Sequence, residues 1–247
     1  MIKVRRAITI LGICGLAASC TTSVDNTSQA EQEWRESVQN INSDFEEIFR
    51  IARHADSSHN VQPWTVIIES ENSILVAVES SRRLPEVDPE NREILLSIGG
   101  FIEMTIQAAE ALGYETDVEM LADSSSESRI ARIVFRKTDA ERNQYKINTL
   151  RSVYTEKKGL SSESMSTDVL ESFQDIAAPD RTDFLRFYKP DSPEAKWVWE
   201  EAPKAAVEQA FRDPVQRELV DLMHFSKTSP REKRIGMTPE MMGLSGI

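Results

Sequence analysis

The sequence predicts an α+β fold in which helices surround a mainly antiparallel sheet. Residues 41–143 carry the order helix, strand, strand, helix, strand, strand. Apolar residues recur every three to four positions in the helical stretches, and short apolar runs bounded by turn residues mark the strands. Residues 144–247 begin again with basic and polar residues and continue mainly with helical patterns. The chain is therefore expected to hold one full unit and a second, partial one.

Local signals give the elements of the first unit. Apolar residues from Ile41 to Ala52 form one face of a helix. Asp88 is an acidic N-cap followed by a proline at the first helical position, and Gly113 stops that second helix. The expected strands are residues 65–68, 74–78, 118–121 and 130–135.

The second unit is expected to be mostly helical. Its helices are predicted at residues 165–177, 194–211 and 214–225, with a strand at 184–188. Pro203 should kink or split the middle helix, because proline has no backbone N–H to donate. No strong strand pattern follows, so this half looks incomplete.

The chain opens with the order of charge and hydropathy that a secretory signal requires. Three basic residues precede the uncharged run 7–18, and small residues then lead into Cys20. The apolar run has about a dozen residues, whereas about 20 are needed to span a bilayer. Residues 1–19 are therefore expected to be a signal peptide, and the polar residues 20–40 a flexible tether.

The end of this signal, LAASC at residues 16–20, resembles the bacterial lipoprotein box, in which the cysteine is lipidated and becomes the mature N-terminus. The resemblance implies that Cys20 is lipidated and that the protein is anchored to a membrane of the bacterial cell envelope. Residues 17–19 would also suit an ordinary cleavage site, which would give a soluble periplasmic protein. Both outcomes stay open.

Cysteine content and charge exclude several classes of protein. The two cysteines are Cys14, inside the signal, and Cys20, so no disulfide framework, cysteine-based zinc site or catalytic cysteine is expected. The formal charge of −12 becomes −15 without residues 1–19, which carry three basic and no acidic side chains. Such a charge repels nucleic acid and anionic lipid. We expect no nucleic-acid partner, and membrane contact through the lipid anchor only.

Gly99 and Gly100 are unusual because they lie in the middle of the second expected helix. Each mid-helix glycine costs roughly 1 kcal/mol relative to alanine. The pair indicates close approach of another backbone or of a flat ligand, or else tight packing between helices.

The histidines suggest no metal site. His54, His59 and His224 are the three in the chain, and none has metal-ligand spacing with another. Ser58 and His59 are adjacent, so their side chains are expected to point in different directions and not to form a nucleophile–base pair. We predict neither a bound metal nor a catalytic side chain.

A second unusual stretch is SSHNVQPW at residues 57–64. Taken alone it is a turn of short polar side chains followed by a buried tryptophan. Its spacing S-x-N-x-Q-P-W resembles the flavin-contacting segment of the nitroreductase superfamily, although Asp56 stands where that segment has a proline. Residues 82–114, with R-x-L-P, D-P and R-E before a glycine-containing helix, resemble the following segment of the Acg-like branch of that superfamily.

The resemblance continues in the second half of the chain. Arg151 and Ser152 match the R-R-S-x-R element of the superfamily, while Leu150 and Tyr154 replace its outer arginines. Residues 235–246, IGMTPEMMGLSG, resemble a later stretch of the same branch.

The resemblance implies a nitroreductase-like fold that binds FMN, as a pseudo-dimer within one chain or as a homodimer. Arg151 with Ser152 would reach the phosphate from the other half, since a guanidinium fork suits a phosphate; Arg151 could also be an ordinary surface arginine. The residues expected to line the flavin ring and ribityl chain are Ser57, Ser58, Asn60 and Gln62.

The expected function is that of an FMN-dependent oxidoreductase. It would pass hydride or electrons from NAD(P)H or another donor to a small-molecule acceptor such as a quinone or a nitro compound, with the flavin carrying the chemistry. Two alternatives stay open. One is a flavin-binding or storage protein without turnover, and the other is a lipoprotein that keeps the fold without flavin.

Overall fold

The chain divides into two units. The computed structural model describes residues 7–8, 42–155, 163–177, 185–224, 235–239 and 241–242. Unit 1 comprises Met1–Thr155 together with Glu218–Ile247, and unit 2 comprises Glu156–Arg217. Apart from residues 7–8, the expected signal, Cys20 and the tether lie outside the described residues.

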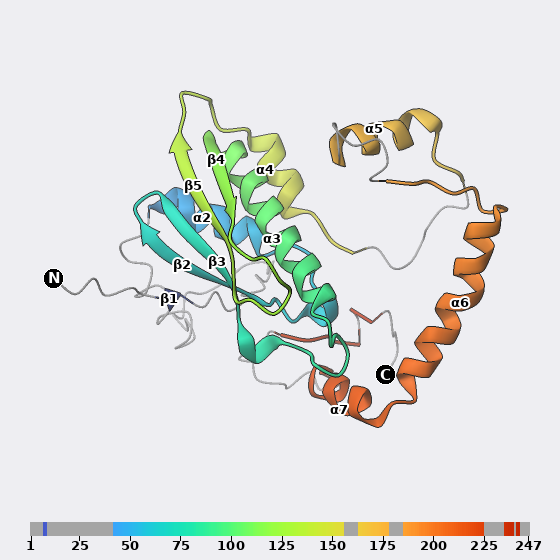
Figure 1. Cartoon of the computed structure of the whole chain (residues 1–247). Helices are drawn as coiled ribbons and strands as arrows, with labels where there is room; N and C mark the ends of the chain where they lie inside the picture. Colours follow the sequence, from blue (N-terminus) through green and yellow to red (C-terminus); the bar gives the residue numbers. More distant parts are fainter. Residues whose placement is uncertain are drawn as a thin grey trace, which may run out of the picture. The chain divides into compact units, whose positions relative to one another are not determined.

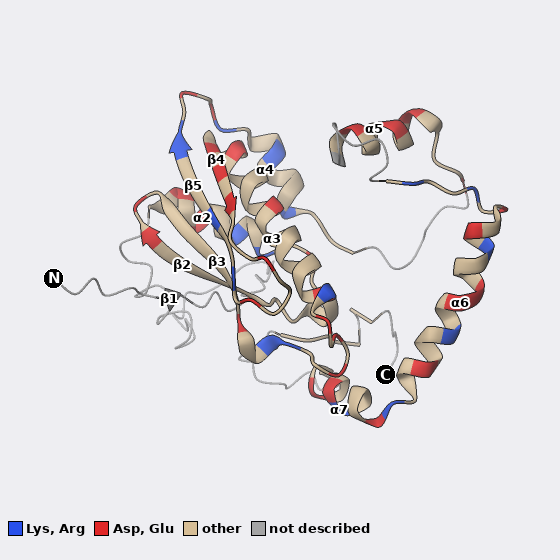
Figure 2. Ribbon diagram, viewed as in Figure 1, with Lys and Arg blue, Asp and Glu red and all other residues tan. Residues whose placement is uncertain are grey.

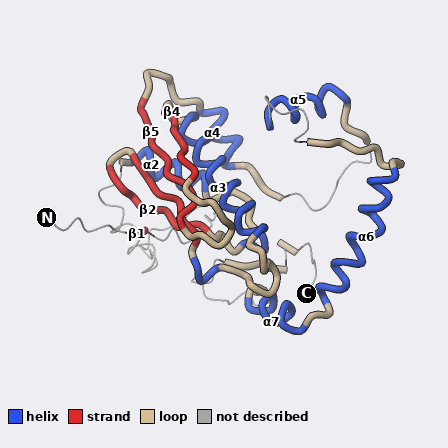
Figure 3. Tube along the Cα trace, viewed as in Figure 1, coloured by secondary structure: helices blue, strands red, loops and turns tan. Residues whose placement is uncertain are grey.

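Unit 1 contains an antiparallel sheet in the order β1-β2-β3-β5-β4. The structure therefore confirms the α+β fold class (Figures 1 and 3). All four strands predicted within residues 41–143 are present. Three of them extend further than the predicted runs, whereas the strand predicted at 118–121 begins four residues earlier and ends at residue 120. The strands are β1 Ala7–Ile8, β2 Trp64–Ser70, β3 Ser73–Val78, β4 Tyr114–Met120 and β5 Arg129–Lys137.

Three helices pack with this sheet around one core: α2 (Ser43–Ala52), α3 (Arg92–Ala111) and α4 (Gln144–Arg151). Helix α3 contacts both α2 and α4 and runs beside the strands (Figure 1). Its length and composition would also suit a membrane span, but half of that apolar window is buried inside the protein. The fold thus uses α3 as its central core helix.

The predicted boundary at residues 143 and 144 does not coincide with the division into units. Helix α4 belongs to unit 1, because Ile147 is fully buried in the same core as α2 and α3. Residues after Glu218 also return to unit 1. In the described part of 144–247 we find helices and one isolated bridge, Met223 to Met237, but no second sheet.

The start of α3 differs from the prediction. Pro89 is not the first helical residue, since the helix begins at Arg92 after Asn91 in the left-handed conformation. Asp88 still caps the helix, because its carboxylate accepts hydrogen bonds from the backbone N–H of Arg92 (2.8 Å) and of Ile94 (3.0 Å). The prediction that Asp88 caps this helix is confirmed, but its carboxylate reaches the helix across a turn. At the other end, Gly113 with φ 80° follows the helix as expected.

We predict that Asp88→Ala lowers the free energy of unfolding by about 1–2 kcal/mol, because two N–H groups at the start of α3 lose their acceptor. Urea unfolding followed by circular dichroism measures the loss. Asp88→Asn keeps one oxygen acceptor and should lose less. An alanine variant with an unchanged midpoint would show that the cap does not matter.

Unit 2 is built from helices α5 (Thr167–Ala177) and α6 (Pro193–Ala210), and α7 (Asp213–Asp221) crosses its boundary. Helix α6 continues through Pro203 and is not split. The strand predicted at 184–188 is wrong over residues 185–188, which form no strand. Among the described residues of this unit, Val215 is the one buried hydrophobic side chain.

Candidate functional site

The turn between α2 and β2, residues 57–63, has an unusual backbone. Among the described residues four non-glycine positions have positive φ, and three of them lie here: His59 (50°), Asn60 (54°) and Gln62 (48°). Such conformations cost of order 1–3 kcal/mol each and gather at functional sites, where the surroundings hold them in place. The predicted flavin segment is thus the most strained stretch of the described chain.

Hydrogen bonds from three directions hold this turn. The backbone N–H of Gln62 donates to Ser57 Oγ at 3.1 Å, which closes the turn on itself. The backbone N–H of Ser58 donates to Ser97 Oγ on α3 at 3.2 Å. The guanidinium of Arg82, at the end of the short helix η2 (Ser80–Arg82), donates to the carbonyl oxygen of Gln62.

A segment near the C-terminus completes the turn. The Asn60 side chain donates through Nδ2 to the carbonyl oxygen of Gly236 at 2.8 Å, and the Gly236 N–H donates to the Asn60 carbonyl oxygen at 3.0 Å. Gln62 Nε2 donates to Asn60 Oδ1 at 3.3 Å. The Asn60 amide is therefore engaged on both sides. Gly236 was not predicted as a site residue, although its glycine stands in the terminal stretch that resembles the Acg-like branch.

Ser58 and His59 do not point apart as expected. Ser58 Oγ lies 2.9 Å from His59 Nδ1, and it also donates to the Glu93 carboxylate of α3. The two side chains meet where the backbone of the turn has positive φ at His59. The serine thus links the imidazole to the acid, an arrangement that fixes the ring and can pass a proton between them.

Arg151 and Ser152 lie at the end of α4. Arg151 is exposed, and its Nη2 pairs with Glu47 Oε1 of α2 at 2.9 Å. Ser152 Oγ donates to the carbonyl oxygen of Thr149 at 2.8 Å. No hydrogen bond described in the structure joins either residue to the turn at 57–63.

The chain after α4 nevertheless passes close to that turn. Thr155 Oγ1 donates a hydrogen bond of 2.8 Å to the side chain of Asp56, the residue directly before the turn. The pKa of His54 is lowered, first by burial and then by the positive charges of Arg53 and Arg151. The structure therefore places the predicted flavin-ring residues and the predicted phosphate residues near the C-terminal end of α2. No hydrogen bond joins the two groups within the described residues.

Gly99 and Gly100 form an open strip on α3. A methyl group built on Gly99 would meet nothing within 4 Å, and one on Gly100 would meet only the Asp56 carbonyl oxygen at 3.9 Å. Leu96 of the same helix is 77% exposed. Tight helix packing is therefore not the reason for these glycines within the described structure, and the strip lies beside the residues that open the turn.

A pocket of about 450 Å³ lies on another side of the turn. Arg82, 7% exposed, is the basic residue of its wall. Figure 2 shows the charged residues of unit 1 on the same view of the ribbon. Burial lowers the pKa of Arg82, and the nearby Glu79 carboxylate opposes this effect. The residues lining the pocket are Val61, Glu79, Ser81, Arg82, Leu84, Leu222 and Ile235.

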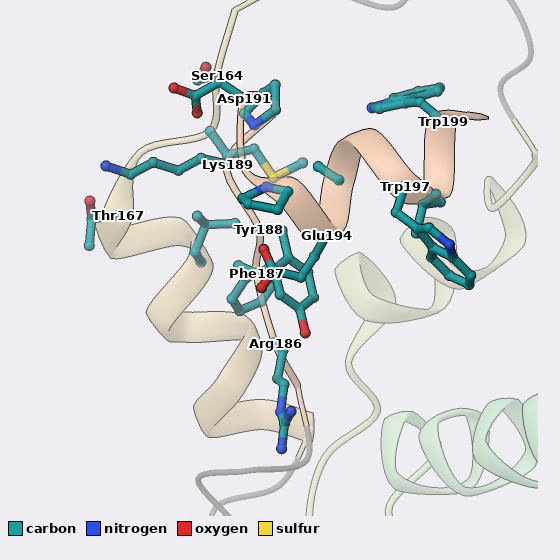
Figure 4. A pocket seen from close by; sticks show the side chains of 16 residues that line it. Ser164, Thr167, Arg186, Phe187, Tyr188, Lys189, Asp191, Glu194, Trp197 and Trp199 are labelled. Carbon is teal, nitrogen blue, oxygen red and sulfur yellow. The ribbon is translucent and has the colours of Figure 1, made fainter. Parts of the chain in front are cut away.

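Unit 2 has a larger pocket of about 1290 Å³, to which no predicted site residue contributes. Phe187 and Tyr188 lie between the start of α5 and the start of α6, and Trp197 and Trp199 lie on α6 (Figure 4). Both tryptophans are largely exposed, so this surface is apolar and open.

Known proteins do not identify the chain: no family model matches it, and no curated protein does. No group of three or more His, Cys, Asp or Glu that could hold a metal occurs among the described residues.

Proposed function

We propose that this protein is an FMN-binding oxidoreductase of the nitroreductase type. The observation that carries the proposal is the turn at 57–63: its sequence resembles a flavin-contacting segment, and its backbone holds three non-glycine residues at positive φ. Strain of this kind is retained where a precise local geometry is needed.

The surroundings of the turn fit a flat ring. The open strip at Gly99 and Gly100 lies beside Asp56, and any side chain at these positions would cover it. Ser57, Ser58, Asn60 and Gln62 would supply the polar edge, and Arg151 would take the phosphate on leaving Glu47, with which it forms an exposed pair. FMN, when bound, would supply hydride transfer between a donor and a small-molecule acceptor.

The hydrogen-bonded chain of Glu93, Ser58 and His59 gives this site a group that handles protons. With Ser58 donating to Glu93, its oxygen can accept from His59 Nδ1–H, which leaves His59 Nε2 outside this chain of hydrogen bonds. Reduction of a quinone or nitro compound consumes protons as well as electrons. Among the described residues at this turn, His59 would be the one to deliver them.

A second candidate is a protein that keeps the fold without flavin. It is favoured by the Asn60 amide, which is already engaged by Gly236 and Gln62. In that case the turn serves to hold the C-terminal segment. A flavin-binding protein without turnover shares flavin binding with the first candidate and the lack of catalysis with the second.

The absorption spectrum of the purified protein, before and after incubation with FMN, separates these candidates. A flavin spectrum supports the first, and its absence after reconstitution excludes it. Bleaching of that spectrum by NAD(P)H, followed by reoxidation with a quinone, distinguishes an enzyme from a storage protein. Export and lipidation at Cys20 belong to the same proposal, and the mass of the mature N-terminal peptide tests them.

Replacing the two contact residues should weaken FMN binding. Asn60→Ala removes an amide, for which we expect about a five- to tenfold loss, and Arg151→Ala removes a charged partner, for which about 10- to 100-fold is expected. Fluorescence titration measures both. Asn72→Ala, in the β2–β3 turn, and Arg136→Ala, on β5, are matched controls and should bind FMN normally. Normal affinity in both site variants would defeat the site assignment.

A further inference from the structure

The pocket beside η2 has a buried cation in its wall. Arg82 is 7% exposed, and arginine is almost never buried to that extent unless it is paired. Among the described residues its side chain makes one hydrogen bond, from Nη1 to the carbonyl oxygen of Gln62. A guanidinium has five N–H donors. Most of the donors of Arg82 are therefore not used by the described protein.

Glu79 does not neutralise this cation directly. It lines the same pocket and affects the pKa of Arg82, but no ion pair within 4.0 Å joins the two in the described structure. The Glu79 carboxylate accepts instead from the side chain and the backbone N–H of Ser81, and these hydrogen bonds lower its pKa. Glu79 is thus charged near neutral pH and faces the pocket as a separate negative group.

Apart from Ser81, the remaining wall is apolar: Val61 from the turn, Leu84 after η2, and Leu222 and Ile235 from the segments near the C-terminus. A cationic fork at one point of an apolar pocket suits a ligand with an oxyanion and an apolar body. The fixed negative charge of Glu79 disfavours a second negative charge on that ligand. A volume of about 450 Å³ admits a small organic molecule.

We infer that this pocket binds a small organic monocarboxylate, with its carboxylate on the Arg82 guanidinium and its apolar body against Val61, Leu84, Leu222 and Ile235. The site is distinct from the flavin contacts proposed above, although Arg82 also holds the carbonyl oxygen of Gln62. It does not require that the protein bind flavin.

Calorimetric titration of the full-length protein with benzoate, and with benzamide as the uncharged control, tests the inference. Benzoate should bind at least tenfold more tightly than benzamide, and phthalate, with two carboxylates, should bind more weakly than benzoate. In Arg82→Gln the preference for benzoate should disappear, while Arg82→Lys should keep part of it. Benzoate binding that is absent, or equal in wild type and Arg82→Gln, would overturn the inference.

A second variant tests the inference even if the Arg82 variants do not fold. Glu79→Gln keeps the oxygen that Ser81 needs but removes the negative charge, so benzoate should bind a few-fold more tightly and phthalate should no longer be disfavoured. An unchanged or weaker affinity for benzoate would speak against the assigned geometry. Because these titrations add no flavin and the pocket shares no proposed flavin contact, their outcome is independent of the FMN measurements, and either proposal can fail alone.

Discussion

Gly236→Ala should release the C-terminal segment from the turn at residues 57–63. Gly236 has φ 98°, a conformation that costs an alanine about 1–2 kcal/mol. Its added methyl group would also collide with the backbone carbonyl of Leu222 and would lie 2.9 Å from His224 Nε2. Backbone cannot move aside as a flexible side chain can, so the segment should give way.

Strain and steric overlap together should lower the free energy that holds the C-terminal segment on the turn by about 2–4 kcal/mol. The loss cannot exceed that free energy, because the segment then detaches. Hydrogen exchange should show faster exchange of the Gly236 and Met237 amides, which donate to Asn60 and Leu222. The core of the sheet should keep its protection. If FMN binds at the turn, its affinity should fall as well, because Asn60 loses both of its bonds to Gly236.

Gly99→Ala is the matched control for this prediction. Gly99 lies inside α3 with no atom within 4 Å of the added methyl group, so the change should leave stability equal or raise it by up to about 1 kcal/mol. Equal effects of the two substitutions would contradict the role given to Gly236. Loss of FMN binding in a stable Gly99→Ala protein would instead support a flat ligand on the strip.

Of these substitutions, Phe101→Ala should lower the free energy of unfolding of unit 1 the most. Phe101 and Trp64 are both fully buried, and their rings stack at a centroid distance of 4.7 Å and an interplanar angle of 15°. The indole N–H of Trp64 has no hydrogen-bond partner in the described structure, so burial and stacking account for its place in the core. Removing the phenyl ring leaves a cavity between α3 and β2.

The expected cost is about 3–5 kcal/mol, the usual range for a buried phenylalanine. That is a large part of the roughly 5–15 kcal/mol that stabilises a typical domain. Urea unfolding monitored by tryptophan fluorescence measures it. Leu96→Ala, on an exposed position of the same helix, should change stability by no more than about 0.5 kcal/mol. A Phe101 variant as stable as the Leu96 variant would show that the ring does not hold this core together.

The strands and helices of residues 42–137 could be predicted because their signals are local. The apolar runs of β2 and β3 and the turn between them involve residues a few positions apart. The end of α3 at Gly113 is equally local. The place of helix α4 in unit 1 could not be predicted in this way, because the burial of Ile147 depends on α2 and α3, which are distant in the sequence.

The candidate site divides in the same way. The sequence by itself determined that SSHNVQPW is a turn leading into a strand with a buried tryptophan, since short polar residues and a proline act on their neighbours. Only the tertiary structure decided that Ser58 meets His59 and Glu93, that Asn60 holds Gly236 across 176 residues, and that Arg82 faces a pocket. These contacts depend on backbone angles and long-range packing, which no local pattern of residues specifies.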